Sequence, residues 1–242
     1  HDFSFDFYEV MTQSDWDRLL GHVRGISEWD PSQNFLIYGV AMSGKPEVTS
    51  ALMGLCDKPA RTKVFEDLAW VASFKGINEA VVAALQPHLQ LDADPMTRRI
   101  AAFVLARTNA PEAEGELLKL FEDKDPDIVS EAIIGLAGKD HAQVRSKVFD
   151  EVNKRLAPTI VELNETELGR VIRERQLYYA RHEWHSGESF RLMAAGFYLV
   201  RSKNQQDHNW MEARLKRIAD WGVRHFIEAK LHSQFQNYDH PW

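Results

Sequence analysis

The stretch Asp92-Ala93-Asp94-Pro95 returns 31 residues later as Asp123-Lys124-Asp125-Pro126. Apolar residues that follow the two stretches match at the same offset. The matched pairs are Ala101 with Ala132, Leu105 with Leu136, Ala106 with Ala137, Ala113 with Val144, Leu117 with Val148, and Phe121 with Val152. Self-similarity with a period of roughly 20–50 residues is typical of solenoid arrays, so the sequence predicts stacked repeats.

Each repeat begins with a signal for the start of a helix. Asp94 and Asp125 stand where an N-cap side chain accepts hydrogen bonds from the first helical turn. Pro95 and Pro126 follow at the first helical position, where the missing N–H costs nothing. The sequence predicts helices near 95–107, 111–121, 126–137 and 141–155. Their expected buried residues are Ala101, Leu105, Leu117, Ala132, Leu136 and Val148.

The aspartate-proline start and the alanine-leucine core resemble the HEAT repeat, particularly its short, lyase-type variant. The resemblance is specific over about 60 residues. It implies an all-α solenoid of stacked antiparallel helix pairs. We expect one domain over 1–242, with an N-terminal cap over 1–45, repeats over 46–157 and a divergent C-terminal helical cap over 158–242. A cap diverges because its outer face meets solvent.

Helical spacing and helix breakers predict further elements outside the two repeats. Ser14-Asp15-Trp16-Asp17 indicates a helix start with acidic residues in its first turn. Alternating Phe3, Phe5 and Phe7 indicate a short strand or an extended strap. Further helices are expected over 46–56, 59–74, 78–85, 165–181, 190–199 and 210–231, and over 34–40, where a strand is the alternative. A loop is expected over 202–209, and the aromatic tail over 235–242 is expected to fold back onto the last helices or to contact a partner.

Charge is unevenly distributed along the 242 residues. Residues 1–163 hold 26 acidic and 17 basic side chains, a net of −9, and residues 164–242 hold 10 and 12, a net of +2. An acidic body is a poor general binder of nucleic acid, because that affinity comes largely from neutralised phosphates. It suits a protein partner with a basic surface. The alternative is that the charge serves solubility alone.

The sequence has no signal for a membrane or for a disulfide framework. No run approaches the roughly 18 apolar residues that a membrane-spanning helix needs. No signal peptide is visible at the start, so we expect a cytoplasmic protein. The single cysteine, Cys56, excludes an internal disulfide.

No catalytic, cofactor or metal site is predicted. His182-Glu183-Trp184-His185 places its histidines three apart, whereas the zinc motif H-E-x-x-H needs them four apart on one helical face. Some HEAT enzymes bind di-iron through several His-Glu pairs, and a single pair argues against that activity. Cys56 lies in an apolar helical context, and Gly44-Lys45 lacks the rest of a phosphate-binding loop.

An arginine-rich helix offers a second hypothesis. Arg170, Arg173 and Arg181, with Tyr178 and Tyr179, would hold phosphates while stacking on bases. HEAT-like DNA glycosylases use such a concave surface. Those proteins are basic overall, whereas this chain is acidic. Arginines interleaved with glutamates more often form surface ion pairs along a helix. Nucleic-acid binding is therefore the less favoured interpretation.

The resemblance also implies where a protein partner binds. In HEAT arrays the second helix of each pair lines the concave surface. Glu112 and Glu116 would point there from one repeat, and Asp150 and Glu151 from the next. The full predicted set adds Asp123 in a nearby loop and the aromatic anchors Tyr178, Tyr179, Trp184 and Trp210. The alternative is a merely solvated acidic face.

The predicted function is a non-catalytic protein-binding module. Small acidic HEAT proteins resemble bacterial inhibitor, immunity or adaptor proteins, which implies a basic partner bound on the acidic concave face. The alternative is a HEAT-type enzyme, such as a DNA glycosylase or a chromophore lyase or isomerase. Fold alone does not choose between them.

Overall fold

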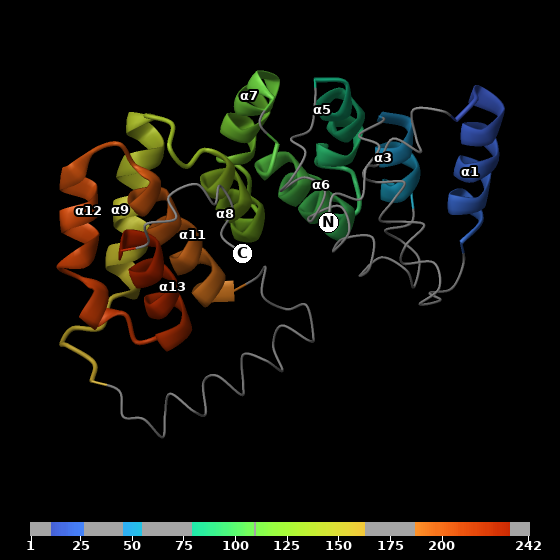
Figure 1. The fold of residues 1–242 in the computed structure, drawn as a ribbon. Coiled ribbons are helices and arrows are strands. Elements are labelled where there is room, and N and C mark those ends of the chain that lie inside the picture. The colour runs from blue at the N-terminus through green and yellow to red at the C-terminus, as the bar shows by residue number, and fades with distance from the viewer. Residues whose placement is uncertain (1–10, 27–45, 55–78, 109, 163–186, 233–242) are drawn as a thin grey trace. The chain divides into compact units, whose positions relative to one another are not determined.

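The computed structural model describes residues 11–26, 46–54, 79–108, 110–162 and 187–232. Every regular element in these ranges is a helix, as Figure 1 shows. The chain divides into two compact units, residues 1–116 and 117–242, so the division falls within one helix. No helix in the described ranges has the length and apolar character needed to cross a membrane.

In the first unit, each of the first described helices contacts the next described helix along the chain. Helix α1 contacts α3, α3 contacts α5, and α5 contacts both the short helix η3 and α6. Packing that proceeds in order along the chain is consistent with a solenoid. The elements are α1 (Gln13–Gly25), α3 (Pro46–Met53), α5 (Glu79–Leu85), η3 (Gln86–Leu89), α6 (Pro95–Ala106) and α7 (Pro111–Leu120), the last of which spans the division between the units.

The predicted repeat starts are confirmed. Asp94 accepts a hydrogen bond from the backbone N–H of Thr97 at 2.9 Å, and α6 begins at the proline that follows. Asp125 accepts from the N–H of Asp127 at 3.0 Å, and α8 (Pro126–Gly135) begins in the same way. Helix α9 (Ala142–Arg155) completes the second repeat. All six residues predicted to be buried are at most 1% exposed: Ala101, Leu105, Leu117, Ala132, Leu136 and Val148.

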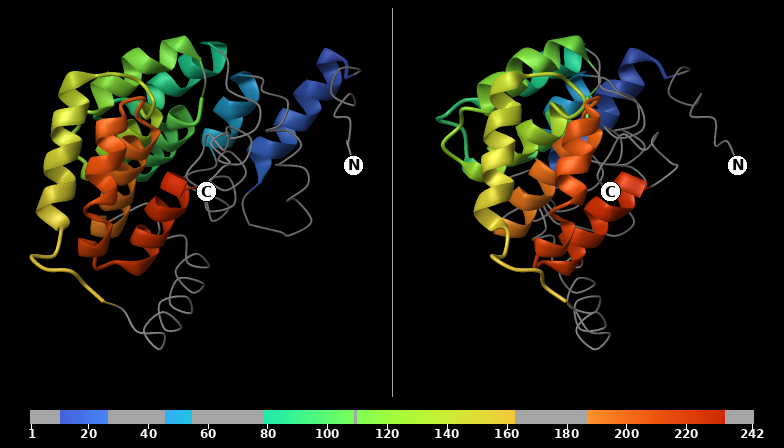
Figure 2. Two further views of the ribbon diagram at one scale, coloured as in Figure 1. Left: turned by 60° about the vertical axis from the view of Figure 1, so that its left-hand side comes forward. Right: turned by 90° about the vertical axis from the view of Figure 1, so that its left-hand side faces the viewer.

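Helix α11 (Gly187–Arg201) is the central helix of the second unit. Every residue from 192 to 200 is buried, and a helix that is apolar on all sides needs neighbours all round. Helix α11 contacts α8, α9, α12 (Gln205–Glu212) and α13 (Trp221–His232), as the views in Figure 2 illustrate. The short helix η4 (Leu215–Arg217) connects the last two.

Close packing of α11 on α13 depends on a glycine. A Cβ atom on Gly196 would clash with Cδ1 of Ile227 and lie 2.8 Å from its Cγ1. Ile227 is fully buried, so a shift of its side chain would disturb a close-packed core. Gly196→Ala is therefore expected to lower the free energy of unfolding by about 1–3 kcal/mol in chemical denaturation, because overpacking a core forces side chains off their rotamers.

Gly21 is a control that separates the effect of packing from the effect of helix propensity on a glycine-to-alanine change. A Cβ atom added to Gly21 in α1 would have no other atom within 4 Å, so Gly21→Ala should stabilise by about 0.5–1 kcal/mol. Adding Ile227→Val, which removes Cδ1, should recover part of the loss caused by Gly196→Ala. Equal stabilisation by both alanines would show that the α11–α13 contact tolerates a methyl group.

Several predicted boundaries are wrong. Helix α1 begins at Gln13 with Thr12 as its N-cap, because Thr12 and Asp15 form a reciprocal capping box. The predicted helix over 46–56 is α3, which ends at Met53. The predicted helix over 190–199 is confirmed as part of α11, which begins at Gly187 with φ +81°. That conformation favours glycine.

The largest error lies near the C-terminal end. The predicted loop over 202–209 contains most of α12, which Asn204 caps by accepting from the N–H of Gln206. The predicted continuous helix over 210–231 is broken. Helix α12 ends at Glu212, and α13 starts after Asp220, whose carboxylate accepts from the N–H groups of Gly222 and Val223 at 3.0 Å.

The remaining predicted elements lie outside the described residues. They are the strand or strap near Phe3, the helices over 34–40, 59–74 and 165–181, and the tail over 235–242. The predicted cap of the helix over 78–85 at Asn78 also lies outside them, and the described part of that helix is α5. The division of one domain into caps and repeats stays a prediction.

Candidate protein-binding surface

Helix α7 presents an acidic outer face. Ala113, Leu117 and Leu120 are buried, so the residues between them face outward. Glu112 lies in the first turn and is exposed, and no hydrogen bond or ion pair links it to another described residue. Acidic side chains are stabilised in a first turn, because the helix dipole places positive charge there. The Glu112 carboxylate is therefore accessible to a binding partner.

Glu116 has a structural contact one turn later on α7. It is half-buried, and its carboxylate accepts a hydrogen bond from Nε2 of Gln86 at 3.1 Å. Gln86 belongs to η3, so this bond connects two elements of the first unit. Glu116 stabilises the unit in addition to contributing negative charge.

Asp123 organises the turn before α8. Its carboxylate accepts from the backbone N–H of Asp125 at 2.8 Å, and Asp125 in turn caps α8. Asp123 and Asp125 therefore have a structural role at the start of the second repeat. Asp123 is half-buried, so it contributes negative charge while it holds this turn.

The acidic excess is concentrated on α7 and the turn that follows it. Residues 112–125 contain six acidic and two basic side chains, a net of −4. Helix α9 contains two acidic and four basic side chains, a net of +2. We call residues 112–125 the acidic stretch.

The two predicted acids of α9 differ in their surroundings. Asp150 is exposed and pairs with no described cation. Glu151 is half-buried and forms ion pairs with Lys154 at 3.0 Å and Arg155 at 2.5 Å. Burial raises the pKa of Glu151, but the hydrogen bonds from these two cations outweigh it, so the pKa is lowered overall. Glu151 is neutralised within the unit, which leaves Asp150 as the available acid of α9.

Trp210 is packed within the second unit. Its ring meets that of Phe149 edge-on, with the centroids 4.6 Å apart. The guanidinium of Arg214 lies 3.9 Å from the Trp210 ring centroid and donates to the Trp210 carbonyl at 3.1 Å. A cation over the ring makes Trp210 a poor anchor for a basic partner. The other predicted anchors, Tyr178, Tyr179 and Trp184, lie outside the described residues.

The structure describes no candidate metal centre in the ranges that it covers. Those ranges contain no group of three or more His, Cys, Asp or Glu side chains placed to hold an ion. His182, His185, Cys56 and Gly44-Lys45 lie outside them, as do Arg170, Arg173 and Arg181.

A buried ion pair between α9 and α12 has no counterpart among the sequence predictions. Asp207 is fully buried in α12, and both of its carboxylate oxygens lie 3.0 Å from Nε of Arg145 in α9. Ser202 donates to the same carboxylate at 2.7 Å. Burial raises the pKa of Asp207, but the bonds from Arg145 and Ser202 outweigh it, and the pKa is lowered overall. The partners are 62 residues apart, so no local pattern could reveal them.

Residues 79–158 match the family model of HEAT repeats. These 80 residues contain α5 to α9, and they include both aspartate-proline starts and all six of the confirmed buried positions. The all-helical fold of the described residues and this match together establish an α-solenoid-like fold. HEAT repeats usually mediate protein interactions, and the family is generally a non-catalytic scaffold. No curated protein and no solved structure matches the chain.

Proposed function

We propose that this protein is a binding module whose acidic stretch, residues 112–125, binds a protein with a basic surface. The observation that carries the proposal is the net charge of −4 on this stretch, within the HEAT-repeat match and with Glu112 exposed at its start. HEAT repeats usually mediate protein interactions, which supports a protein as the partner. Asp150 on α9 is a further exposed acid within the HEAT-repeat match.

The charge would act mainly on the rate and choice of binding. Opposed potentials increase association rates and disfavour wrong partners more than they add affinity. A binder of this kind acts by occupying a surface, as an inhibitor or immunity protein does when it covers an active site. An adaptor would use the same surface to hold two proteins together. Binding should therefore slow as salt concentration rises.

Charge reversal on the acidic stretch tests the proposal. Glu112→Lys with Glu122→Lys changes two exposed side chains that have no partner among the described residues. The partner would be recovered by affinity capture from the native organism and identified by mass spectrometry. We expect its association rate with the double variant to fall by about tenfold at low salt, with an unchanged melting temperature.

A control with the same change in charge completes the test. Asp17→Lys with Glu212→Lys alters two exposed acids away from the acidic stretch in sequence. It should leave the association rate within about twofold of the parent. Binding of the Glu112/Glu122 variant at the parental rate would contradict the proposal, and so would retention of duplex DNA by the parent at physiological salt.

A further inference from the structure

A lysine of α9 is bound to the turn that follows α7. We call residues 121–125 the acidic turn, since they contain three acidic side chains and one lysine. Nζ of Lys147 donates a hydrogen bond to the backbone carbonyl of Phe121 at 3.1 Å. The same ammonium lies 4.3 Å from the centroid of the Phe121 ring. Both residues belong to the second unit, so the contact lies within one compact body.

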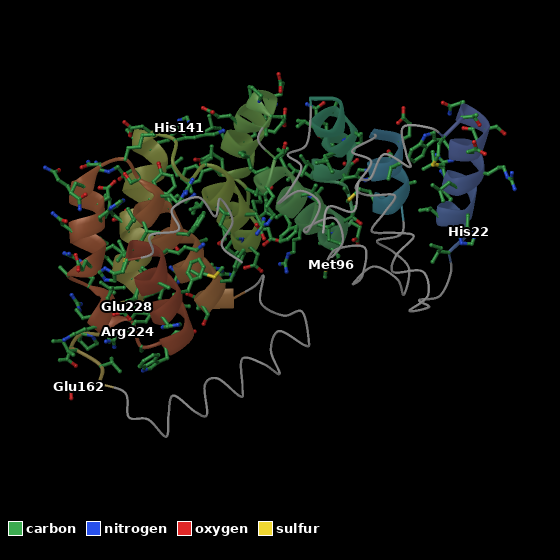
Figure 3. The ribbon with its side chains drawn as sticks, viewed as in Figure 1. His22, Met96, His141, Glu162, Arg224 and Glu228 are labelled. Atoms are coloured by element: carbon green, nitrogen blue, oxygen red, sulfur yellow. The ribbon has the colours of Figure 1, made fainter. Side chains whose placement is uncertain are left out.

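The position of Lys147 on α9 explains how it reaches the acidic turn. It lies in the second turn of the helix, close to the N-cap residue His141, which Figure 3 labels. Val144 and Val148 are fully buried on the same side of α9, and Lys147 is half-buried beside them. A lysine at the edge of a buried stripe packs its alkyl chain on apolar neighbours and directs its ammonium outward. Here the ammonium meets a carbonyl and the face of a ring.

Lys147 completes the hydrogen bonds at the C-terminal end of α7. The last carbonyls of a helix have no partner within it, and a lysine suits them because the helix dipole is negative there. The N–H groups of the two residues after Phe121 donate to carbonyls in the last turn of α7, at 3.1 and 3.0 Å. The Phe121 carbonyl comes next along the chain and accepts from Lys147. Phe121 is 2% exposed, so its ring fixes the start of the acidic turn in the core.

Lys147 fixes the acidic turn without forming an ion pair to its acids. Its ammonium bonds to a carbonyl and to no carboxylate of a described residue. Glu122 is exposed, and its carboxylate has no hydrogen bond or ion pair with a described residue. After Glu122, the carboxylate of Asp123 accepts from the N–H of Asp125 at 2.8 Å. The turn is therefore fixed on both sides of Glu122, whose carboxylate stays accessible.

We infer that Lys147 is a positioning residue for the binding of a basic protein by the acidic stretch. It fixes the backbone of the acidic turn, so that the carboxylates there meet the cations of a partner in an arrangement that already exists. Ordering a loop on binding reduces affinity, and a surface that is fixed beforehand avoids this loss. The inference rests on the proposed function, and it makes a cation part of a surface that binds by its negative charge.

Charge and positioning predict opposite effects for the loss of Lys147. Removing a cation makes the surface more negative, which increases the rate of association with a basic partner. Removing the bond to Phe121 loosens the acidic turn, and a partner dissociates faster from a less ordered surface. Lys124 is the matched control, since it is exposed in the same turn and has no hydrogen bond or ion pair with a described residue. Lys147→Met and Lys124→Met change the charge equally and differ in the bond that is lost.

Amide hydrogen exchange on the whole chain tests the positioning itself. In Lys147→Met the amides of Glu122 and Asp123 should exchange about threefold to tenfold faster, because their bonds to the end of α7 open more often. Amides in the interior of α8 should exchange as in the parent, which shows that the unit is folded. Lys124→Met should leave both regions unchanged. Lys147→Arg keeps a cation with N–H donors and should preserve the parental exchange of the acidic turn.

Binding is measured with basic peptides selected by display on the whole chain. Peptides that no longer bind the Glu112→Lys, Glu122→Lys double variant are kept as probes of the acidic stretch. We expect Lys147→Met to increase the dissociation rate of these peptides by about fivefold without slowing their association. Lys124→Met should increase the association rate by about twofold and leave dissociation unchanged. Lys147→Arg should release the peptides at the parental rate.

The outcomes separate this inference from the proposed function. If no basic peptide depends on Glu112 and Glu122, the proposed function is contradicted, and the role of Lys147 in binding with it. If such peptides exist and the two methionine variants behave alike, the inference alone is overturned, because Lys147 then acts only through its charge. Parental exchange of the acidic turn in Lys147→Met would overturn it too. So would fast dissociation from Lys147→Arg with parental exchange, because the order of the turn would then not control binding.

Discussion

Leu105→Asp is expected to unfold the first unit. Leu105 is fully buried in α6, and its neighbours Phe103 and Val104 are buried to the same degree. A carboxylate there has no partner that replaces water, and burial without compensation is among the most destabilising changes known. The expected loss is about 4 kcal/mol or more of unfolding free energy, a large share of the roughly 5–15 kcal/mol that is typical of a whole protein.

Chemical denaturation followed by far-ultraviolet circular dichroism measures this loss. Leu91→Asp is the matched control, since Leu91 is 74% exposed and lies just before the same repeat. The control should change stability by at most about 0.5 kcal/mol. Parental stability in Leu105→Asp would mean that α6 does not form the core that the repeat pattern predicts.

The repeats were predictable because their information is local. Asp94 and Asp125 each bond to the first turn of the helix that follows, within three residues. Local capping fixes the register of the helix, and the apolar spacing then defines which face is buried. Both steps need only a short window of sequence.

The C-terminal part of the second unit was not predictable in this way. Polar residues over 202–209 resemble a loop, yet they contain most of α12. That helix is stabilised by partners distant in sequence, since Asp207 bonds to Arg145 and Trp210 packs on Phe149, both in α9. Tertiary contacts of this kind override local propensity, and a single sequence gives no sign of them.

The surface features also differ in whether local sequence could predict them. The negative charge of α7 follows from sequence alone, and Glu112 is exposed as that prediction requires. The structural contact of Glu116 was hidden, because Gln86 lies 30 residues away. The bonds that hold residues 157–161 were hidden for the same reason, since Arg217 and Arg224 donate to backbone carbonyls there across about sixty residues. Sequence predicts which charges are present, and the fold decides which remain available.

Arg145→Ala is expected to destabilise the second unit in a pH-dependent way. It leaves the buried carboxylate of Asp207 with the Ser202 hydroxyl as its remaining hydrogen-bond donor among the described side chains. Removing one member of a buried ion pair typically costs roughly 3–5 kcal/mol. The Arg145 side chain is 35% exposed, so water can enter the space that it leaves. We therefore expect a loss of about 2–4 kcal/mol at neutral pH, against about 0–1 for Lys154→Ala at an exposed ion pair.

The sign of the pH dependence identifies the cause. In the parent the pKa of Asp207 lies below its ordinary value of 3.8, because the bonds from Arg145 and Ser202 outweigh burial. The resulting stability is fully present above that ordinary value and is lost as pH falls through the folded pKa. In Arg145→Ala the effect of burial dominates, so the pKa of Asp207 should rise. Protonation of Asp207 then removes the buried charge and recovers part of the lost stability. Urea denaturation at a series of pH values should show the difference between parent and variant shrinking as pH falls from neutral towards 3.8 and below. A difference that stays constant would mean that Arg145 stabilises the unit by packing against Phe149, whose ring centroid lies 5.2 Å from its guanidinium, and not by its charge.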